Sequence, residues 1–163
     1  QPIHVHYSPV LDSINYWFMR KSVNLYGETL VKTLAFEKNR KGTTEDGLEI
    51  MKDFWKTKGI DPASLRMIDG SGLSPQNRVT ANSLVKVLQY ARSRSWFTQY
   101  MAAFPEYNKM KLKSGTIGGS KGFAGYHTSK EGITYTVAFI VNNYNGSANE
   151  IVRKMFLVLD ELK

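Results

Sequence analysis

The part of the chain that says most about its architecture lies between residues 110 and 142, where it reads MKLKSGTIGGSKGFAGYHTSKEGITYTVAFIVN. Three segments in it have the composition of β-strands, and turns rich in glycine separate them. In the last segment every second residue is apolar or aromatic, which is the period of a strand with one buried face. The sequence therefore predicts three antiparallel strands, over Met110–Ser114, Gly122–Thr128 and Ile133–Asn142.

Helices are predicted on both sides of these strands along the chain. After the strands, Ser147 begins an amphipathic helix that runs to Leu162. Before them, apolar stripes and capping residues predict helices over Leu11–Glu37, Thr44–Lys56, Thr80–Ala91 and Trp96–Phe104. A short strand is expected over Leu65–Ile68, and residues 1–10 read as an extended segment. Helices, then antiparallel strands, then a helix indicate an α+β fold class.

The composition of the chain excludes several classes of protein before any motif is considered. The 163 residues make one domain, and no apolar run reaches the length of a membrane span. The absence of cysteine excludes a disulfide framework and cysteine-based zinc or redox chemistry. His4 and His6 share a face of the extended segment but lack a third ligand nearby, so no metal is expected. The formal charge of +8 favours an anionic partner, although the basic residues are scattered rather than gathered in a nucleic-acid patch.

One candidate chemical group lies at the end of the first predicted strand, in Lys113-Ser114-Gly115-Thr116. On a strand Lys113 and Gly115 share a face, so a positive charge stands beside a gap that another backbone can approach. Taken alone, the motif is better explained as a lysine before a hairpin turn.

A second candidate interrupts the long N-terminal helix at Ser22-Val23-Asn24. Residues i and i+2 of a regular helix point in different directions, so the helix must break if both side chains face one cleft. Farther on, Asp69-Gly70-Ser71-Gly72 has glycines that could cradle a phosphate, but it lacks the lysine of a P-loop. We expect a structural loop there, in which Asp69 binds backbone amides. Taken alone, Ser22-Val23-Asn24 is better explained as a polar pair on a solvated helix face.

Together these motifs resemble the signature set of penicillin-recognising serine enzymes. The chain is similar, over nearly its whole length, to the class C low-molecular-mass penicillin-binding proteins of the D-alanyl-D-alanine carboxypeptidase/endopeptidase type. The similar segments are HYSPVL at 6–11, RKSVNL at 20–25, DGSGLS at 69–74 followed by Asn77, and KSGT at 113–116 followed by Gly122 and AGY at 124–126. Two departures are mild: Val23 replaces the usual aspartate, and Ser114 replaces threonine but keeps the hydroxyl.

The third departure concerns the nucleophile, which in this family belongs to a Ser-x-x-Lys motif upstream of Ser-x-Asn. Here Ser83-Leu84-Val85-Lys86 is the one such pattern, and it follows Ser-x-Asn inside a predicted helix. We interpret it as a chance match. The resemblance therefore implies that residues 1–163 are a single fragment, the C-terminal part of a penicillin-binding transpeptidase/β-lactamase-like domain whose nucleophile-bearing N-terminal part is absent.

The resemblance assigns catalytic roles to Ser22, Asn24 and Lys113. In an acyl-transfer reaction on peptidoglycan stem peptides, Ser22 relays a proton toward the leaving amine. Asn24 holds the substrate amide and the catalytic lysine of the absent segment, and Lys113 keeps the local field positive. The fragment alone is expected to be inactive.

The resemblance assigns substrate binding to Ser114, Gly115 and Thr116. The Ser114 hydroxyl binds the substrate carboxylate, and the Thr116 backbone N–H is one donor of the oxyanion hole. Gly115 leaves room beside them for the substrate. No metal or other cofactor is implied.

The implied partners are peptidoglycan peptides, β-lactams and the absent N-terminal part of the same polypeptide, in a periplasmic or other extracytoplasmic location. A five-stranded parental sheet would leave an edge and an apolar patch open, through which the fragment dimerises, swaps strands or is marginally stable. The alternatives are a non-catalytic peptidoglycan-binding module, a β-lactamase-like hydrolase and a basic nucleic-acid-binding domain. Carboxypeptidase and endopeptidase preference, and the diamino acid of the stem peptide, stay open.

Overall fold

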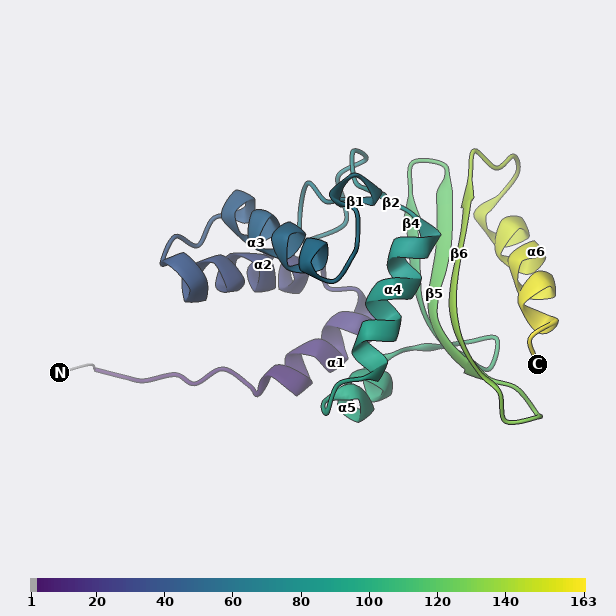
Figure 1. Ribbon diagram of the computed structural model, residues 1–163, viewed down its shortest axis with the longest axis horizontal. Coiled ribbons are helices and arrows are strands. Elements are labelled where there is room, and N and C mark those ends of the chain that lie inside the picture. Colours follow the sequence, from purple (N-terminus) through teal and green to yellow (C-terminus); the bar gives the residue numbers. More distant parts are fainter. Residues whose placement is uncertain (1–2) are drawn as a thin grey trace.

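The computed structural model describes residues 3–163, which form an α+β fold (Figure 1). Its helices are α1 (Leu11–Lys21), α2 (Asn24–Asn39), α3 (Thr44–Thr57), a 3₁₀ turn (Pro62–Ser64), α4 (Ala81–Arg92), α5 (Phe97–Ala103) and α6 (Ala148–Asp160). Its strands are β1 (Leu65–Arg66), β2 (Arg78–Val79), β3 (Glu106–Tyr107), β4 (Met110–Ile117), β5 (Ser120–Thr128) and β6 (Thr134–Asn142). No helix within residues 3–163 is both long and apolar enough to cross a membrane.

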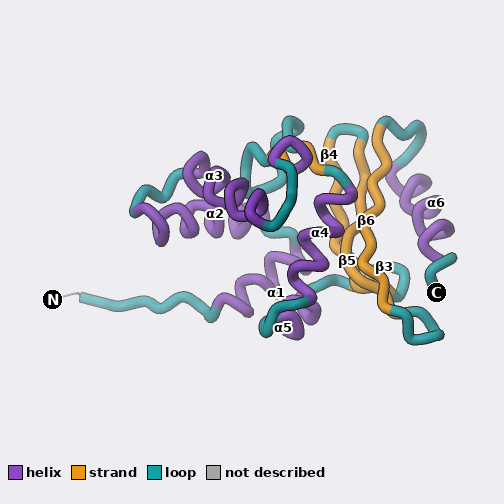
Figure 2. Tube along the Cα trace, viewed as in Figure 1, coloured by secondary structure: helices purple, strands orange, loops and turns teal. Residues whose placement is uncertain are grey.

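The main sheet is antiparallel, with the strand order β3-β4-β5-β6 (Figure 2). The three predicted strands are confirmed as β4, β5 and β6, but β4 and β5 extend farther than predicted. They meet in a two-residue turn at Gly118-Gly119, where both glycines have positive φ, so the ladder continues to the pair Ile117–Ser120. The prediction ended the first strand too early and began the second too late, because it treated these flanking residues as part of the loop.

The prediction of three strands was also incomplete, because β3 is a fourth strand of this sheet. It has only two residues, and it pairs with the start of β4 through a turn at Asn108-Lys109. Both turn residues have positive φ, at 52° and 61°, without a glycine. Lysine is uncommon in that conformation, so the sequence carried no usual hairpin signal.

Helices cover both faces of the sheet (Figure 1). On one face α6 buries Met155 and Leu159 against Met110, Leu112 and Phe123. These five side chains are almost fully buried and form the larger core cluster of the described residues.

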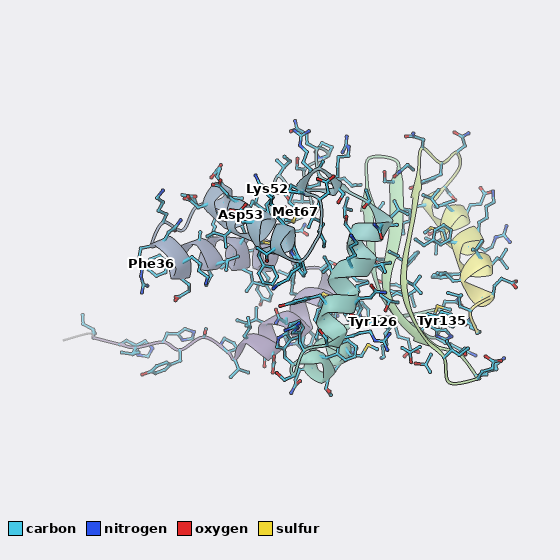
Figure 3. All side chains as sticks on the ribbon, viewed as in Figure 1. Phe36, Lys52, Asp53, Met67, Tyr126 and Tyr135 are labelled. Atoms are coloured by element: carbon cyan, nitrogen blue, oxygen red, sulfur yellow. The ribbon has the colours of Figure 1, made fainter. Side chains whose placement is uncertain are left out.

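The opposite face packs against α4 and α5. Tyr126 of β5 is completely buried there, in one cluster with Leu88 and Phe104, and Figure 3 labels it where α4 meets the sheet. Its hydroxyl donates to the Leu88 carbonyl over 2.8 Å, so the buried polar group is satisfied. This packing fixes the position of α4 relative to β4 and β5.

The predicted helix over Leu11–Glu37 is two helices, and the break falls at the predicted Ser-x-Asn motif. Ser22 is left-handed, with φ 50° and ψ 47°, and Val23 is extended. The remaining helices of the prediction are confirmed within two residues at each end. Residues 3–10 form neither helix nor strand, and residues 1 and 2 of the predicted extended segment lie outside the described residues.

The loop that follows β1 is organised by one carboxylate, as predicted. Asp69 accepts hydrogen bonds from the backbone N–H groups of Gly72 at 2.6 Å and Ser74 at 2.7 Å, and from the Asn77 side chain at 3.2 Å. Burial opposes ionisation of Asp69, but the hydrogen bonds from Ser74, Asn77 and Gly72 outweigh it and lower the pKa of the carboxyl. β1 and β2 pair at the base of this loop, over fewer residues than the predicted strand Leu65–Ile68.

Replacing this carboxylate should destabilise the fold. We expect Asp69→Ala to lower the free energy of unfolding in urea by about 2–3 kcal/mol, because it removes several hydrogen bonds to a charged acceptor. Asp53→Ala on the exposed side of α3 is the matched control and should change it little. Since the pKa of Asp69 is lowered in the folded state, its contribution is present above the ordinary value of about 4 and is lost as pH falls through the lowered pKa. An equal loss in both variants at neutral pH would contradict this role.

Candidate active site

The break between α1 and α2 brings Ser22 against β4. The Lys113 ammonium donates a hydrogen bond to the Ser22 hydroxyl, across 91 positions of sequence, and a second one to the Ser114 carbonyl at 2.9 Å. Helix α1 itself is packed on α5, where the Arg20 guanidinium donates to the Ala102 carbonyl at 3.3 Å. The tertiary packing therefore joins two motifs that the sequence analysis could only consider separately.

Asn24 lies at the first position of α2, on the other side of the break. With its amide oriented to satisfy its neighbours, the nitrogen donates to the carbonyls of Ser71 at 3.2 Å and Ser22 at 3.3 Å. The side chain thus links the break to the Asp69 loop rather than to Lys113. The structure brings Ser22 and Lys113 into contact and places Asn24 beside Ser22.

Glu28, one turn into α2, is a positioning residue that the sequence analysis missed. Its carboxylate accepts from the Gly70 backbone N–H at 2.9 Å and from the Thr44 hydroxyl. The bond from Thr44, then that from Gly70, lowers the pKa of Glu28. A Cβ on Gly27 would stand 2.2 Å from the Gly70 carbonyl oxygen, so only glycine allows this approach. The sequence offered one signal for this role, because Gly27 and Glu28 follow shortly after the Ser-x-Asn motif.

Lys113 is partly buried and has no carboxylate within ion-pair distance among the described residues. Burial lowers the pKa of its ammonium, and the positive charge of Lys121 lowers it further. A lysine with a lowered pKa, hydrogen-bonded to a serine hydroxyl, is suited to receiving and passing on a proton.

The remaining predicted site residues follow Lys113 along β4. The Ser114 hydroxyl donates to the Tyr107 hydroxyl at 3.3 Å, and the Thr116 hydroxyl accepts from the Lys121 ammonium at 2.7 Å. A Cβ built on Gly115 would meet no atom within 4 Å. The predicted gap beside Lys113 is therefore open space, and within residues 3–163 no other backbone enters it.

A cavity of about 750 Å³ borders these residues. The run from Lys113 to Gly118 forms part of the lining, and the helices contribute a mainly apolar wall. This wall consists of Met19 of α1, Leu84, Val87 and Leu88 of α4, Tyr100 of α5, and Phe104, which directly follows α5. The lining includes Arg78, Lys113 and Lys121 but no aspartate or glutamate, so its charge is entirely positive.

The alternative Ser-x-x-Lys pattern lies outside this arrangement. Ser83 is 2% exposed, and its hydroxyl is hydrogen-bonded to those of Ser64 at 2.7 Å and Thr80 at 2.8 Å. The Lys86 ammonium donates to the Gly59 carbonyl instead. Neither side chain lines the cavity, which supports the interpretation of the pattern as a chance match.

The metal-ligand pair considered at the N-terminus is not completed by the fold. His4 and His6 are both exposed. Across residues 3–163, no group of three histidine, aspartate or glutamate side chains is placed to hold a metal ion.

Comparison with solved structures gives the same fold. Penicillin binding protein 4 (dacB) from Haemophilus influenzae, solved in complex with a novel β-lactam, superposes with a TM-score of 0.78 at 24% identity. The match covers 92% of this chain and 41% of that one. The structure of the same protein described without the β-lactam gives a TM-score of 0.79.

Sequence comparison identifies relatives among characterised bacterial proteins. A D-alanyl-D-alanine carboxypeptidase of Actinomadura sp. (strain R39) is 34% identical over 160 residues, which is 85% of this chain and 29% of the relative. The D-alanyl-D-alanine carboxypeptidase DacB of Haemophilus influenzae is 24% identical over 86% of this chain and 33% of its own length. The chain thus spans about a third of the length of these relatives. The family model for D-Ala-D-Ala carboxypeptidase 3 (S13) matches residues 1–162, and the chain belongs to this peptidase family.

Proposed function

We propose that this chain is the C-terminal part of a serine-type D-alanyl-D-alanine carboxypeptidase/endopeptidase that hydrolyses peptidoglycan stem peptides and binds penicillin. The observation that carries the proposal is the contact between Lys113 and Ser22, which unites the two family motifs in one site. A cavity without acidic side chains beside them suits a substrate that carries a carboxylate.

In the proposed reaction a serine attacks the carbonyl between two D-alanines and forms an acyl-enzyme, which water then hydrolyses. Ser22 passes a proton toward the leaving amine, with Lys113 as its hydrogen-bonded partner. Asn24 holds the substrate amide and the catalytic lysine of the nucleophile's own segment. Its contacts with Ser71 and Ser22 support this role, because they fix the amide at the break.

Substrate binding falls to the residues after Lys113. The Ser114 hydroxyl binds the carboxylate of the terminal D-alanine, and the open space at Gly115 admits the peptide. The Thr116 backbone N–H stabilises the oxyanion, a contribution worth about 10²–10³ in rate for a typical donor. No cofactor takes part.

The nucleophile and its lysine, we propose, come from a part of the polypeptide N-terminal to this chain. The burial of Ser83 and its hydrogen bonds to Ser64 and Thr80 support this proposal, because they make Ser83 an unsuitable nucleophile. The cavity beside Lys113 has room and an apolar wall for another segment, and a serine there would lie within reach of the site. The substrate is part of the cell wall, so we place the enzyme in the periplasm or another extracytoplasmic compartment.

Labelling with fluorescent penicillin tests the function. We expect an adduct on the longer polypeptide and none on residues 1–163 alone, because the chain lacks the nucleophile. In the longer polypeptide, Ser22→Ala and Lys113→Met should slow acylation by about 10²–10⁴, the range for lost proton transfer.

The control for this experiment is Ser83→Ala in the longer polypeptide, which should be labelled at the wild-type rate once its folding is verified. An adduct that maps to Ser83 would overturn the proposal. Labelling of neither protein would favour a non-catalytic peptidoglycan-binding module, and rapid release of the adduct would favour a β-lactamase-like hydrolase.

A second prediction concerns β6, which lies at the edge of the main sheet and pairs only with β5 among the described residues. An unpaired edge favours association with another strand. We expect residues 1–163 alone to form dimers or to unfold at low denaturant concentration, whereas the longer polypeptide should do neither. Sedimentation equilibrium and urea unfolding measure both properties. A compact monomer that unfolds only at a high urea concentration would contradict the expectation that the open edge of β6 causes association or low stability.

A further inference from the structure

Lys121 lies on β5, outside the motifs that identify the family, and contacts Thr116 of β4. We infer that the Lys121 ammonium and the Thr116 hydroxyl together bind the terminal carboxylate of the substrate, which makes Lys121 a specificity-determining residue. The inference rests on the proposed function and deepens it, because it names the group that recognises the free carboxylate.

The position of Lys121 is fixed by the hairpin. The two-residue turn at Gly118-Gly119 sets the register, so Lys121 stands directly opposite Thr116. Directly paired residues share one face of the sheet, and the two side chains meet at 2.7 Å between Nζ and Oγ1. Ser114, two residues before Thr116, lies on the same face of β4.

The charge of Lys121 is not balanced by an acidic side chain. None of the ion pairs of the described residues includes Lys121 or Lys113, and the cavity that both of them line contains no carboxylate. Among the described residues, Lys121 donates a hydrogen bond to Thr116 and makes a cation–π contact with the Phe123 ring, with Nζ 5.4 Å from its centroid. The third cation of the cavity, Arg78, uses its guanidinium on the carbonyls of Pro75 and Asn77. Of the three cations that line the cavity, Lys121 is therefore the one that is bound neither to a carboxylate nor to a backbone carbonyl.

The ammonium groups of Lys113 and Lys121 also act on each other. Repulsion from Lys121 contributes to the lowered pKa of Lys113, after burial. An anion bound beside Lys121 would relieve this repulsion, so the site favours a negatively charged ligand.

The donors match a carboxylate at the correct place along a D-alanyl-D-alanine peptide. An ammonium and two hydroxyls offer several hydrogen bonds to two oxygens, and bonds to ionised groups are the strong ones. Only a nitrogen and one Cα separate that carboxylate from the scissile carbonyl. The proposed oxyanion donor is the backbone N–H of Thr116, so one residue would present its N–H to the carbonyl and its hydroxyl to the carboxylate.

The test compares Lys121→Met with the wild type in the longer polypeptide, using benzylpenicillin and its methyl ester. Acylation rate constants come from competition with fluorescent penicillin. We expect the rate with the free acid to fall between about tenfold and about a hundredfold, the effect of losing one charge-assisted hydrogen bond. The rate with the ester should change less than about threefold, so the preference for the acid shrinks.

Three further variants sharpen the comparison. Lys121→Arg should keep most of the preference for the acid, because it keeps the charge. Thr116→Val should lose part of the preference, because it removes the hydroxyl but keeps the backbone N–H. Lys130→Met, on an exposed turn, is the matched control for loss of one lysine and should behave as the wild type.

Loss of rate with acid and ester alike in Lys121→Met would mean a structural role and would overturn the inference, as would an unchanged preference. If the wild-type polypeptide is not labelled at all, the proposed function fails and the inference falls with it. A second measurement uses residues 1–163: by NMR titration, the pKa of Lys113 should rise in Lys121→Met and stay unchanged in Lys130→Met. An unchanged pKa of Lys113 in Lys121→Met would contradict the proposed repulsion between the two lysines.

Discussion

Ser22 adopts a left-handed conformation, and the rest of the site depends on the break that this residue makes between α1 and α2. A continuous helix would point Ser22 and Asn24 in different directions. The break lets the Ser22 hydroxyl face Lys113 while Asn24 faces the Asp69 loop. The helices on the two sides of the break are held by separate contacts. Helix α1 is packed on α5, and Glu28 holds α2 against the Asp69 loop. The strain of one left-handed serine is thus supported from two directions.

The electrostatics of the site depend on the absence of acidic side chains from the lining of the cavity. Lys113 is partly buried, Lys121 stands near it, and no acidic side chain lines the space between β4 and α4. Two cations without an acidic side chain beside them repel each other, and an anionic ligand would offset this repulsion. The apolar wall from α4 and α5 lowers the local polarity, which strengthens charge interactions at this edge of the sheet. The same residues therefore provide the proposed proton transfer and the proposed selection for a carboxylate.

Much of the fold could be predicted because its signals are local. The alternation in β6, the capping residues Thr43, Thr80 and Ser147, and the apolar stripe of α4 each act within a few residues. Two features could not be predicted in this way. β3 depends on a hairpin whose residues, Asn108 and Lys109, adopt positive φ without glycine. Lys121 was missed because the predicted strand began one residue after it, although the Gly118-Gly119 turn would have placed it opposite Thr116.

By itself, the sequence determined the fold class, the order of most helices and of the three long strands, and the motif residues on which the family resemblance rests. These properties are encoded by the period of apolar residues and by a few short motifs, which act locally along the chain. Only the tertiary structure decided that Lys113 contacts Ser22, that Ser83 is a buried packing residue, and that Lys121 and Lys113 share a cavity without a carboxylate. Such contacts join residues up to 91 positions apart, and they depend on how α1, α4 and the sheet pack together rather than on any local pattern.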